Sequence, residues 1–168
     1  SKYTFEISNA LKGAEGQAFA AIKKEFFTTF RSDNAFPVLS EEELLTKVQE
    51  QTFRYFWDHA DPITGWARER MPNPRDGDIV TSGGTGFGIA ALITASERGW
   101  ISREAAVDRM LKITAASQQL ERFHGMWAHW YNPATGKVHN FSKYDDGGDI
   151  VESAFLAQGL LTARQYFN

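Results

Sequence analysis

The 168-residue sequence contains no cysteine, and this absence excludes several kinds of site. Without thiols the chain forms no disulfide, holds no thiolate-bound zinc and carries no cysteine nucleophile. The sequence also lacks any apolar run near the roughly 18 residues of a membrane-spanning helix. Nor does it contain a basic amphipathic stretch of the kind that binds membrane surfaces. We therefore expect no membrane partner.

An excess of charge of one sign is missing as well. The 18 basic and 21 acidic side chains give a formal net charge of −3, and the basic residues are dispersed along the chain. Proteins that bind nucleic acid instead cluster lysine and arginine where phosphates lie. We therefore do not expect a nucleic acid partner.

Aromatic side chains, in contrast, are abundant. They make up 14% of a chain that is 42% hydrophobic and has the length of one compact domain. This exceeds what a small core ordinarily needs, and tryptophan and tyrosine combine a flat apolar face with a polar group. The surplus favours a surface that stacks on a flat ligand.

The first 39 residues form a separate region in this interpretation. Residues 2–8 alternate between apolar and polar and predict a short strand. Residues 17–31 repeat apolar side chains at intervals of three and four, which predicts an amphipathic helix ending before Ser32. Region 1–39 is thus expected to hold one strand and a lead-in helix.

The second region, 40–168, opens with a capping box at Ser40 and Glu43, which predicts a helix. A turn at residues 61–65 should end this helix, and residues 66–81 then read as a long polar connection, which is often functional. The side chains of the helix that we expect to face inward are Leu44, Leu45, Val48, Thr52, Tyr55 and Phe56.

Residues 82–88 form a glycine-rich segment that precedes an apolar helix. Such a segment can bind phosphate at a helix N-terminus. A dinucleotide fingerprint would however require glycine at Ile89, and no Gly-Lys-Ser/Thr follows for a phosphate-binding loop. The glycines are therefore assigned to close helix packing beside a ligand groove.

This helix should end at Gly99, with Trp100 completing a Schellman motif, and Ser102 should cap the next helix. So short a connection predicts an antiparallel helical hairpin, whose second helix runs to about Gln119. The side chains expected inside are Val107, Met110, Leu111 and Thr114.

Residues 127–141 alternate on both sides of a Pro/Gly turn at 132–136, which predicts a β-hairpin carrying Trp127 and Trp130. His124, His129 and His139 lie in or beside it. Their spacing matches no standard metal site, and hydrogen-bonding histidines are commoner, so we do not expect a metal.

The stretch 144–155 places four carboxylates and two glycines before the last helix. Asp149 and Glu152 share one face of the first turn if the helix starts at Asp149, and Gly147 and Gly148 would let Asp145 approach them. Neighbouring like charges raise the pKa of a carboxyl, whereas a helix N-terminus lowers it, and an acid and a base need separated pKa values. The stretch is no calcium loop, because Leu156 occupies the twelfth position.

A structural alternative explains part of this pattern. Asp149 and Glu152 also have the spacing of a helix start, with aspartate as N-cap and glutamate reaching back. Caps are commoner than active sites, yet a cap leaves Asp145 and Asp146 unexplained. The helix should bury Val151, Phe155, Leu156, Leu160 and Ala163.

Several segments resemble, in order, the glucoamylase-like family of bacterial α/α-toroid glycoside hydrolases. This family includes endo-acting β-1,2-glucanases and related exo-acting enzymes, and similar domains occur in cyclic β-1,2-glucan synthases. The resemblance covers residues 40–167. Its segments are 51–58, 65–70, 85–88, 97–102, 122–125 and 144–165.

The resemblance implies a mainly α fold in which helical hairpins form part of an (α/α)6 toroid, with a small β-hairpin beside the acidic site. It implies an inverting glycoside hydrolase that acts on an oligo- or polysaccharide, a β-glucan with β-1,2 linkage favoured, without a cofactor. Asp149 and Glu152 would then do the proton work or position water, and Asp145 would anchor substrate. The further substrate-binding candidates are Trp66, Arg68, His124, Trp127, Trp130, Tyr144 and Asp146.

The family's toroid has about twelve helices, which need on the order of 190 residues, whereas this sequence predicts five. The chain therefore resembles the N-terminal part of such a protein, and we expect a periplasmic or secreted location. An uncovered apolar face on the last helix should cause self-association or require a C-terminal remainder. That face would contain Phe155, Leu156, Leu160 and Leu161.

Two alternatives stay open. A non-catalytic carbohydrate-binding module would keep Trp66, Trp127 and Trp130 and need none of the acids. A helical fragment without activity would need neither group. Endo or exo action, and whether a second catalytic carboxylate lies beyond residue 168, are not decided by the sequence.

Overall fold

The structure is a computed structural model that describes residues 1–29, 37–72 and 77–168. The chain divides into two compact units, Ser1–Ser40 and Glu41–Asn168. Each unit is described by itself.

The first unit is a two-stranded antiparallel ribbon of β1 (Lys2–Ile7) and β2 (Ile22–Phe27). The predicted strand is confirmed, but the predicted helix is wrong, because β2 lies inside it; its end at Arg31 and the break at Ser32 fall outside the described residues. Ile22 and Phe26 also fit a period of two and pair with Ile7 and Tyr3, and the rings of Tyr3 and Phe26 stack 5.5 Å apart. Pairing with a distant strand therefore overrides the local helical pattern.

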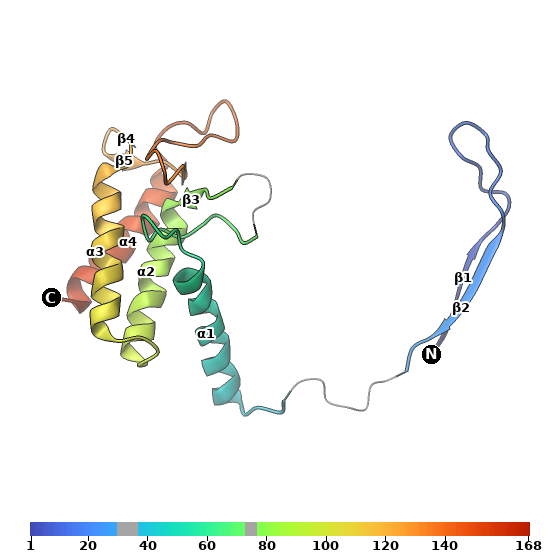
Figure 1. The fold of residues 1–168 in the computed structure, drawn as a ribbon, viewed down its shortest axis with the longest axis horizontal. Helices are drawn as coiled ribbons and strands as arrows, with labels where there is room; N and C mark the ends of the chain where they lie inside the picture. The colour runs from blue at the N-terminus through green and yellow to red at the C-terminus, as the bar shows by residue number, and fades with distance from the viewer. Residues whose placement is uncertain (30–36, 73–76) are drawn as a thin grey trace. The chain divides into compact units, whose positions relative to one another are not determined.

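The second unit contains four helices among its described residues, so the predicted mainly α architecture is confirmed (Figure 1). Two short ladders join its loops: β3 with β6, and β4 with β5. The helices are α1 (Glu41–Asp58), α2 (Ser82–Glu97), α3 (Arg103–Gln119) and α4 (Ile150–Tyr166). The strands are β3 (Val80–Thr81), β4 (Arg122–Phe123), β5 (Met126–Trp127) and β6 (Trp130–Tyr131).

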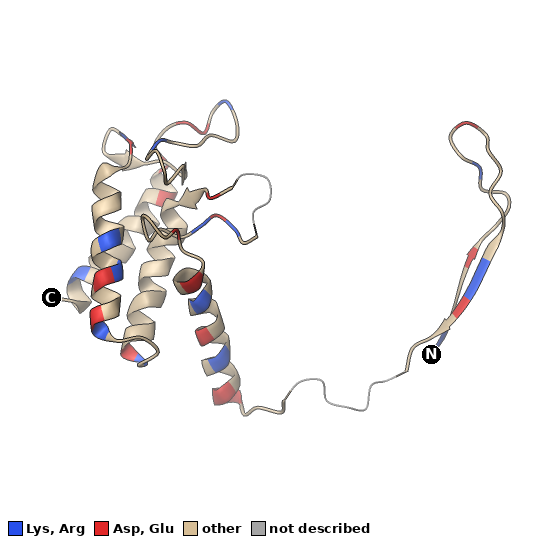
Figure 2. Cartoon of the chain, viewed as in Figure 1, with Lys and Arg blue, Asp and Glu red and all other residues tan. Residues whose placement is uncertain are grey.

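Helices α2 and α4 pack with their backbones in close approach. A Cβ atom on Gly86 would lie 2.8 Å from the Leu156 nitrogen, and one on Gly159 would lie 2.9 Å from the Gly86 Cα. Glu97 is the one charged residue of α2, and Figure 2 shows this helix in tan over most of its length. The assignment of the glycine-rich segment to close helix packing is therefore confirmed.

The α2–α3 helical hairpin is also confirmed. Gly99 has φ +70°, the Trp100 N–H donates to the Ala95 carbonyl at 2.9 Å, and the Ser102 hydroxyl accepts from the Ala105 N–H at 3.1 Å. Two inward positions were wrong, because Leu111 and Thr114 are exposed. The buried face of α3 consists of Ala106, Met110, Ile113 and Ser117.

The first half of α1 is not buried, contrary to the prediction. Leu44, Leu45, Val48 and Thr52 are exposed, and Tyr55 and Phe56 are only half-buried. Packing begins at Phe53, whose ring lies 5.7 Å from that of Trp57 and 6.1 Å from that of Trp100.

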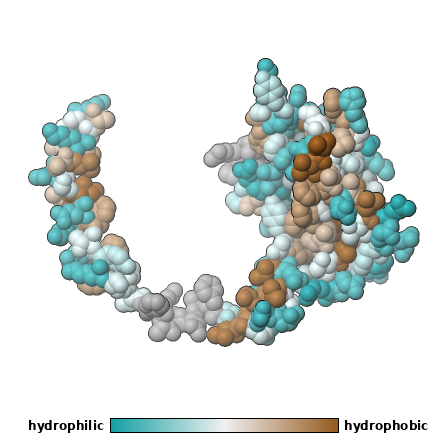
Figure 3. All heavy atoms as spheres, turned by 180° about the vertical axis from the view of Figure 1, so that it is seen from behind, coloured by the Kyte–Doolittle hydropathy of each residue, from teal (hydrophilic) through white to brown (hydrophobic). Residues whose placement is uncertain are grey.

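Helix α4 buries Leu156 and Ala163 and half-buries Leu160, but Val151 and Phe155 are exposed. Leu156 therefore does not belong to the uncovered face, which Phe155 and Leu161 do join. The rings of Phe87 and Phe155 lie 5.0 Å apart beside a groove between α2 and α4. Figure 3, which shows the molecule from behind, has brown hydrophobic patches on the surface of the second unit.

Residues 66–81 are less polar than expected, because their described ends are buried. Trp66, Ala67, Ile79 and Val80 belong to the core. β3 then pairs with β6, so that Val80 lies opposite Tyr131. Within the part of the chain that the structure describes, no helix is long and apolar enough to cross a membrane.

Candidate active site

An open depression of about 430 Å³ lies between β6 and the loop that precedes α4. Its volume falls in the range of roughly 300–1,000 Å³ that is typical of small-ligand sites. Four of the predicted site residues meet there, together with His129, two glycines and Ile150. The four are Trp130, Tyr144, Asp145 and Asp149.

Asp149 is the N-cap of α4. Its Oδ1 accepts hydrogen bonds from the N–H groups of Val151 and Glu152 at 2.9 and 3.0 Å. The Asp149 N–H donates to the Trp127 carbonyl at 2.8 Å, which ties the helix start to β5. The capping interpretation of Asp149 is confirmed, and the helix begins at Ile150. Both capping hydrogen bonds go to Oδ1, so the Oδ2 atom of Asp149 can make other contacts.

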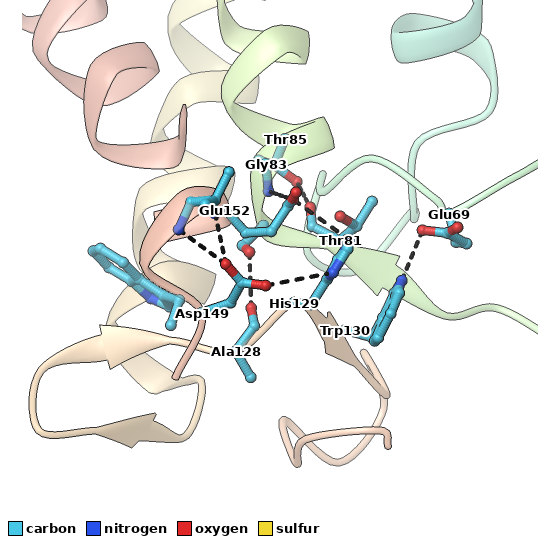
Figure 4. A network of polar contacts seen from close by, with 12 residues as sticks. Glu69, Thr81, Gly83, Thr85, Ala128, His129, Trp130, Asp149 and Glu152 are labelled. Atoms are coloured by element: carbon cyan, nitrogen blue, oxygen red, sulfur yellow. Dashed lines mark hydrogen bonds and ion pairs between the residues drawn. The ribbon is translucent and has the colours of Figure 1, made fainter. Parts of the chain in front are cut away.

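Glu152 does not reach back to the N-cap, so that half of the capping-box interpretation is wrong. Its Oε2 instead accepts a hydrogen bond from the Gly83 N–H at 3.0 Å, at the first turn of α2 (Figure 4). The N-cap of α2, Thr81, makes no side-chain cap, so a carboxylate from another helix satisfies one free N–H there. A Cβ on Gly83 would lie 2.8 Å from the Glu152 Cδ, and glycine permits this approach.

His129 lies between these two carboxylates. Its Nδ1 is 3.7 Å from Asp149 Oδ2, and its Nε2 is 3.6 Å from Glu152 Oε2 (Figure 4). Sequence reasoning weighed this histidine as a metal ligand, preferred a hydrogen-bonding role, and missed the contact with the two carboxylates. The available signal was its place beside Trp130 in a segment that leads to the acidic stretch.

Trp130 holds His129 in place. The two rings stack with centroids 3.6 Å apart and an interplanar angle of 6°. The Trp130 Nε1–H donates to Glu69 Oε2 at 2.8 Å, and Phe141 packs perpendicular to the indole at 4.9 Å. One face of the predicted sugar-stacking tryptophan is thus already covered by His129.

Asp145 lines the depression but is engaged in its own turn. Its Oδ1 accepts from the Ser142 N–H at 2.7 Å and from the Ser142 hydroxyl at 2.8 Å. Desolvation raises the pKa of Asp145, but hydrogen bonds from the Ser142 side chain and from backbone groups outweigh it and lower that pKa. The Asp145 carboxylate is therefore an ionised group that lines the same depression as Asp149. Asp146 and Tyr144 are exposed.

Trp66 was predicted wrongly as a substrate-binding residue. It is 0% exposed, its Nε1–H donates to the Ile113 carbonyl at 3.3 Å, and its ring packs perpendicular to Tyr131 at 5.8 Å. An indole enclosed in this way offers no face to a ligand. It belongs to the core beneath β3 and β6.

Three more candidates lie away from the depression. Trp127 is half-buried, and its Nε1–H donates to the Ser117 carbonyl of α3 at 3.1 Å. Arg68 forms an ion pair with Asp78. His124 occupies the exposed turn between β4 and β5 with φ 50°.

The side chains that meet at this site are of the types that transfer protons. The His129 imidazole is within ion-pair distance of the carboxylates of both Asp149 and Glu152, next to an open depression. Such groups are the usual donors and acceptors of general acid–base catalysis. Among the described residues, no group of three or more histidine, aspartate or glutamate side chains is arranged to hold a metal ion.

Comparison with known proteins gives relatives for most of the chain, although no family model matches it. An exo β-1,2-glucooligosaccharide sophorohydrolase (non-reducing end) of Parabacteroides distasonis is 49% identical over 131 residues. The match covers 77% of this chain and 18% of the relative. The chain therefore spans less than a fifth of that protein's length.

Solved structures of similar proteins also match this chain over most of its length. An endo-β-1,2-glucanase from Chitinophaga pinensis, in complex with sophorotriose and glucose, matches with a TM-score of 0.74 and 50% identity. This match covers 77% of the present chain and 32% of the other. A β-1,2-glucanase from Parabacteroides distasonis matches with a TM-score of 0.73 and 41% identity over 94% of this chain and 21% of that one. The chain is therefore a homologue of part of these β-1,2-glucan hydrolases and has the fold of that part.

Proposed function

We propose that this chain forms part of the catalytic domain of a glycoside hydrolase that cleaves β-1,2-linked glucan. The observation that carries the proposal is the 49–50% identity, over 77% of the chain, to two enzymes whose names specify β-1,2-glucan substrates. The depression adds support, because it places carboxylates beside an opening of ligand size.

The geometry favours Asp149 as the group that exchanges a proton with substrate. Oδ1 is held by two backbone N–H groups, whereas Oδ2 is not engaged by them and Asp149 lines the depression. Glu152 lies deeper, against Gly83, and does not line the depression. Asp145 and the exposed Tyr144 on the same loop are placed to bind hydroxyl groups and a sugar face.

An inverting reaction needs a carboxylic acid that protonates the leaving oxygen and a carboxylate that activates water, roughly 6.5–9.5 Å apart. Asp149 is our candidate for the acid. The partner that activates water is Glu152 or a carboxylate elsewhere in the full polypeptide. Cleavage of a β-linkage by this route releases the α-anomer first.

The test is hydrolysis of linear β-1,2-glucan by the full polypeptide that contains this chain, with Asp149→Asn and Glu152→Gln as controls. We expect reducing ends from β-1,2-glucan and none from β-1,3- or β-1,4-glucans, an α-anomeric first product by proton NMR, and loss of turnover in Asp149→Asn. Binding of β-1,2-glucan without release of reducing ends would instead identify a carbohydrate-binding module.

A further inference from the structure

His129 presents both ring nitrogens to carboxylates of the same helix end. Nδ1 faces Asp149 Oδ2 at 3.7 Å and Nε2 faces Glu152 Oε2 at 3.6 Å. A neutral imidazole has one N–H donor and one acceptor nitrogen. It can therefore donate to only one of the two carboxylates, and its other nitrogen faces an oxygen favourably only when that oxygen carries a proton.

Each of the three side chains is also held by a contact other than those between the imidazole and the two carboxylates. Asp149 Oδ1 is fixed by the first amides of α4, and Glu152 Oε2 by the Gly83 N–H of α2. The imidazole is fixed by stacking on Trp130, whose N–H is bound by Glu69. Rotation of the imidazole out of line would break the stack, so the arrangement is preorganised.

The charged surroundings of His129 are simple in the part of the chain that the structure describes. Asp149 and Glu152 at the start of α4 are within ion-pair distance of its ring nitrogens, and Asp145 lines the same depression as His129. Glu69 lies on the far edge of Trp130, and the first turn of α2 contributes the uncharged residues Ser82 and Gly83.

From this geometry we infer that His129 is a positioning residue that passes a proton between Glu152 and Asp149, an inference that rests on the proposed function. Nε2 accepts the proton of Glu152 while Nδ1 releases its own proton to Asp149. One proton leaves Glu152, one arrives at Asp149, and the imidazole ends neutral in its other tautomer. Asp149 thereby returns to the acid form after it has protonated a leaving oxygen.

The contacts of 3.6 and 3.7 Å have to shorten for this transfer. Catalytic hydrogen bonds are often long in unliganded enzymes and tighten in the complex with substrate. Glutamine is the decisive replacement for His129, because its amide offers a donor and an acceptor but does not relay a proton. Alanine removes both groups.

In the full polypeptide that contains this chain, we expect His129→Gln and His129→Ala to lower kcat on β-1,2-glucan about 10²- to 10⁴-fold, the usual contribution of acid–base catalysis. KM should change less than kcat, because the inferred role of His129 is to pass a proton between Glu152 and Asp149 rather than to bind substrate. Free imidazole should restore part of the kcat of His129→Ala. Wild-type kcat and an unchanged pH profile in His129→Gln would refute the relay.

Glu69 provides a matched control for the support of the ring. Glu69→Gln keeps an acceptor for the Trp130 N–H and should retain most of kcat, whereas Glu69→Leu removes the acceptor and should lower kcat. Equal activity of the two variants would show that the Trp130 anchor does not matter.

A second measurement does not depend on turnover. Nitrogen-15 NMR of the His129 imidazole reports which nitrogen carries the proton, and it is compared between wild type, Asp149→Asn and Glu152→Gln. We expect each substitution to shift the balance of tautomers, and identical spectra would overturn the inference. A wild type that does not hydrolyse β-1,2-glucan refutes the proposed function, while these spectra still decide whether His129 couples the two carboxylates.

Discussion

Replacement of Gly86 by alanine tests whether the contact between α2 and α4 is as close as the structure shows. The new Cβ would lie 2.5 Å from the Phe155 carbonyl carbon and 2.8 Å from the Leu156 nitrogen. Both atoms belong to the backbone of α4 and cannot rotate away. The two helices must therefore separate by roughly 1 Å to restore ordinary contact, because protein interiors are close-packed.

The magnitude follows from three contributions. Overpacking costs about 1–3 kcal/mol, and a gap of roughly 1 Å along the helices forfeits part of their dispersion attraction. Alanine in a helix regains about 1 kcal/mol relative to glycine. We expect a net loss of about 1–2 kcal/mol in the free energy of unfolding.

Gly159→Ala should act in the same way, because its Cβ would lie 2.9 Å from the Gly86 Cα. One separation of the helices relieves both clashes, so the double variant should lose less stability than the sum of the single variants. The atoms nearest to a Cβ on Gly88 belong to the side chain of Phe56, and Gly147→Ala would meet nothing within 4 Å. Both are matched controls with smaller expected losses.

The assay is equilibrium urea unfolding of the 168-residue chain at 25 °C, followed by circular dichroism, with glucan hydrolysis by the full polypeptide as a second readout. Separation of α2 from α4 would also pull Gly83 from Glu152, so activity should fall with stability. A Gly86→Ala chain as stable as wild type would refute the close packing.

Three further predictions concern the cap, the core and the surface. Asparagine at position 149 still accepts hydrogen bonds from the amides of Val151 and Glu152, so Asp149→Asn should leave stability nearly unchanged and abolish turnover. Asp149→Ala should also lose about 0.5–2 kcal/mol of stability in thermal or urea unfolding. A large stability loss in Asp149→Asn with intact turnover would favour a purely structural role. Burial raises the pKa of Tyr131 to about 12 from 10.0. The contribution of the neutral Tyr131 side chain to the free energy of unfolding is therefore fully present below pH 10 and should decline by about 3 kcal/mol as the pH rises toward 12. The free energy of unfolding of Tyr131→Phe should change less over this range. The exposed side chains of Phe87, Val151 and Phe155 should make the isolated chain self-associate, as measured by light scattering. Phe155→Gln should reduce self-association more than Leu111→Gln on α3. A monomeric wild-type chain would contradict this prediction.

The features that the sequence determined by itself are those whose signals and partners are close in the chain. Gly99 with its left-handed φ and Ser102 with its capping hydroxyl mark the ends of α2 and α3, and both interactions span only a few residues. Asp149 as the N-cap of α4 is local in the same way. Such contacts depend on backbone geometry and side-chain reach, so they are predictable before any tertiary contact forms.

Tertiary structure decided the contacts between distant segments. Apolar spacing predicted a helix around β2, but pairing with β1 gave these residues a strand partner. Trp66 was predicted to bind substrate, yet it is a core residue that contacts Tyr131 and the Ile113 carbonyl. Glu152 exchanged a local partner for Gly83, which lies 69 residues away.

The site follows the same division. The sequence supplied the carboxylates at the start of α4, because their spacing and the cap are local. Only the packing of α2, β6 and α4 placed His129 between Asp149 and Glu152, since its position depends on the stack with Trp130 and on the start of a different helix. Contacts of this kind arise when separate elements share one core, and no local pattern of residues encodes them.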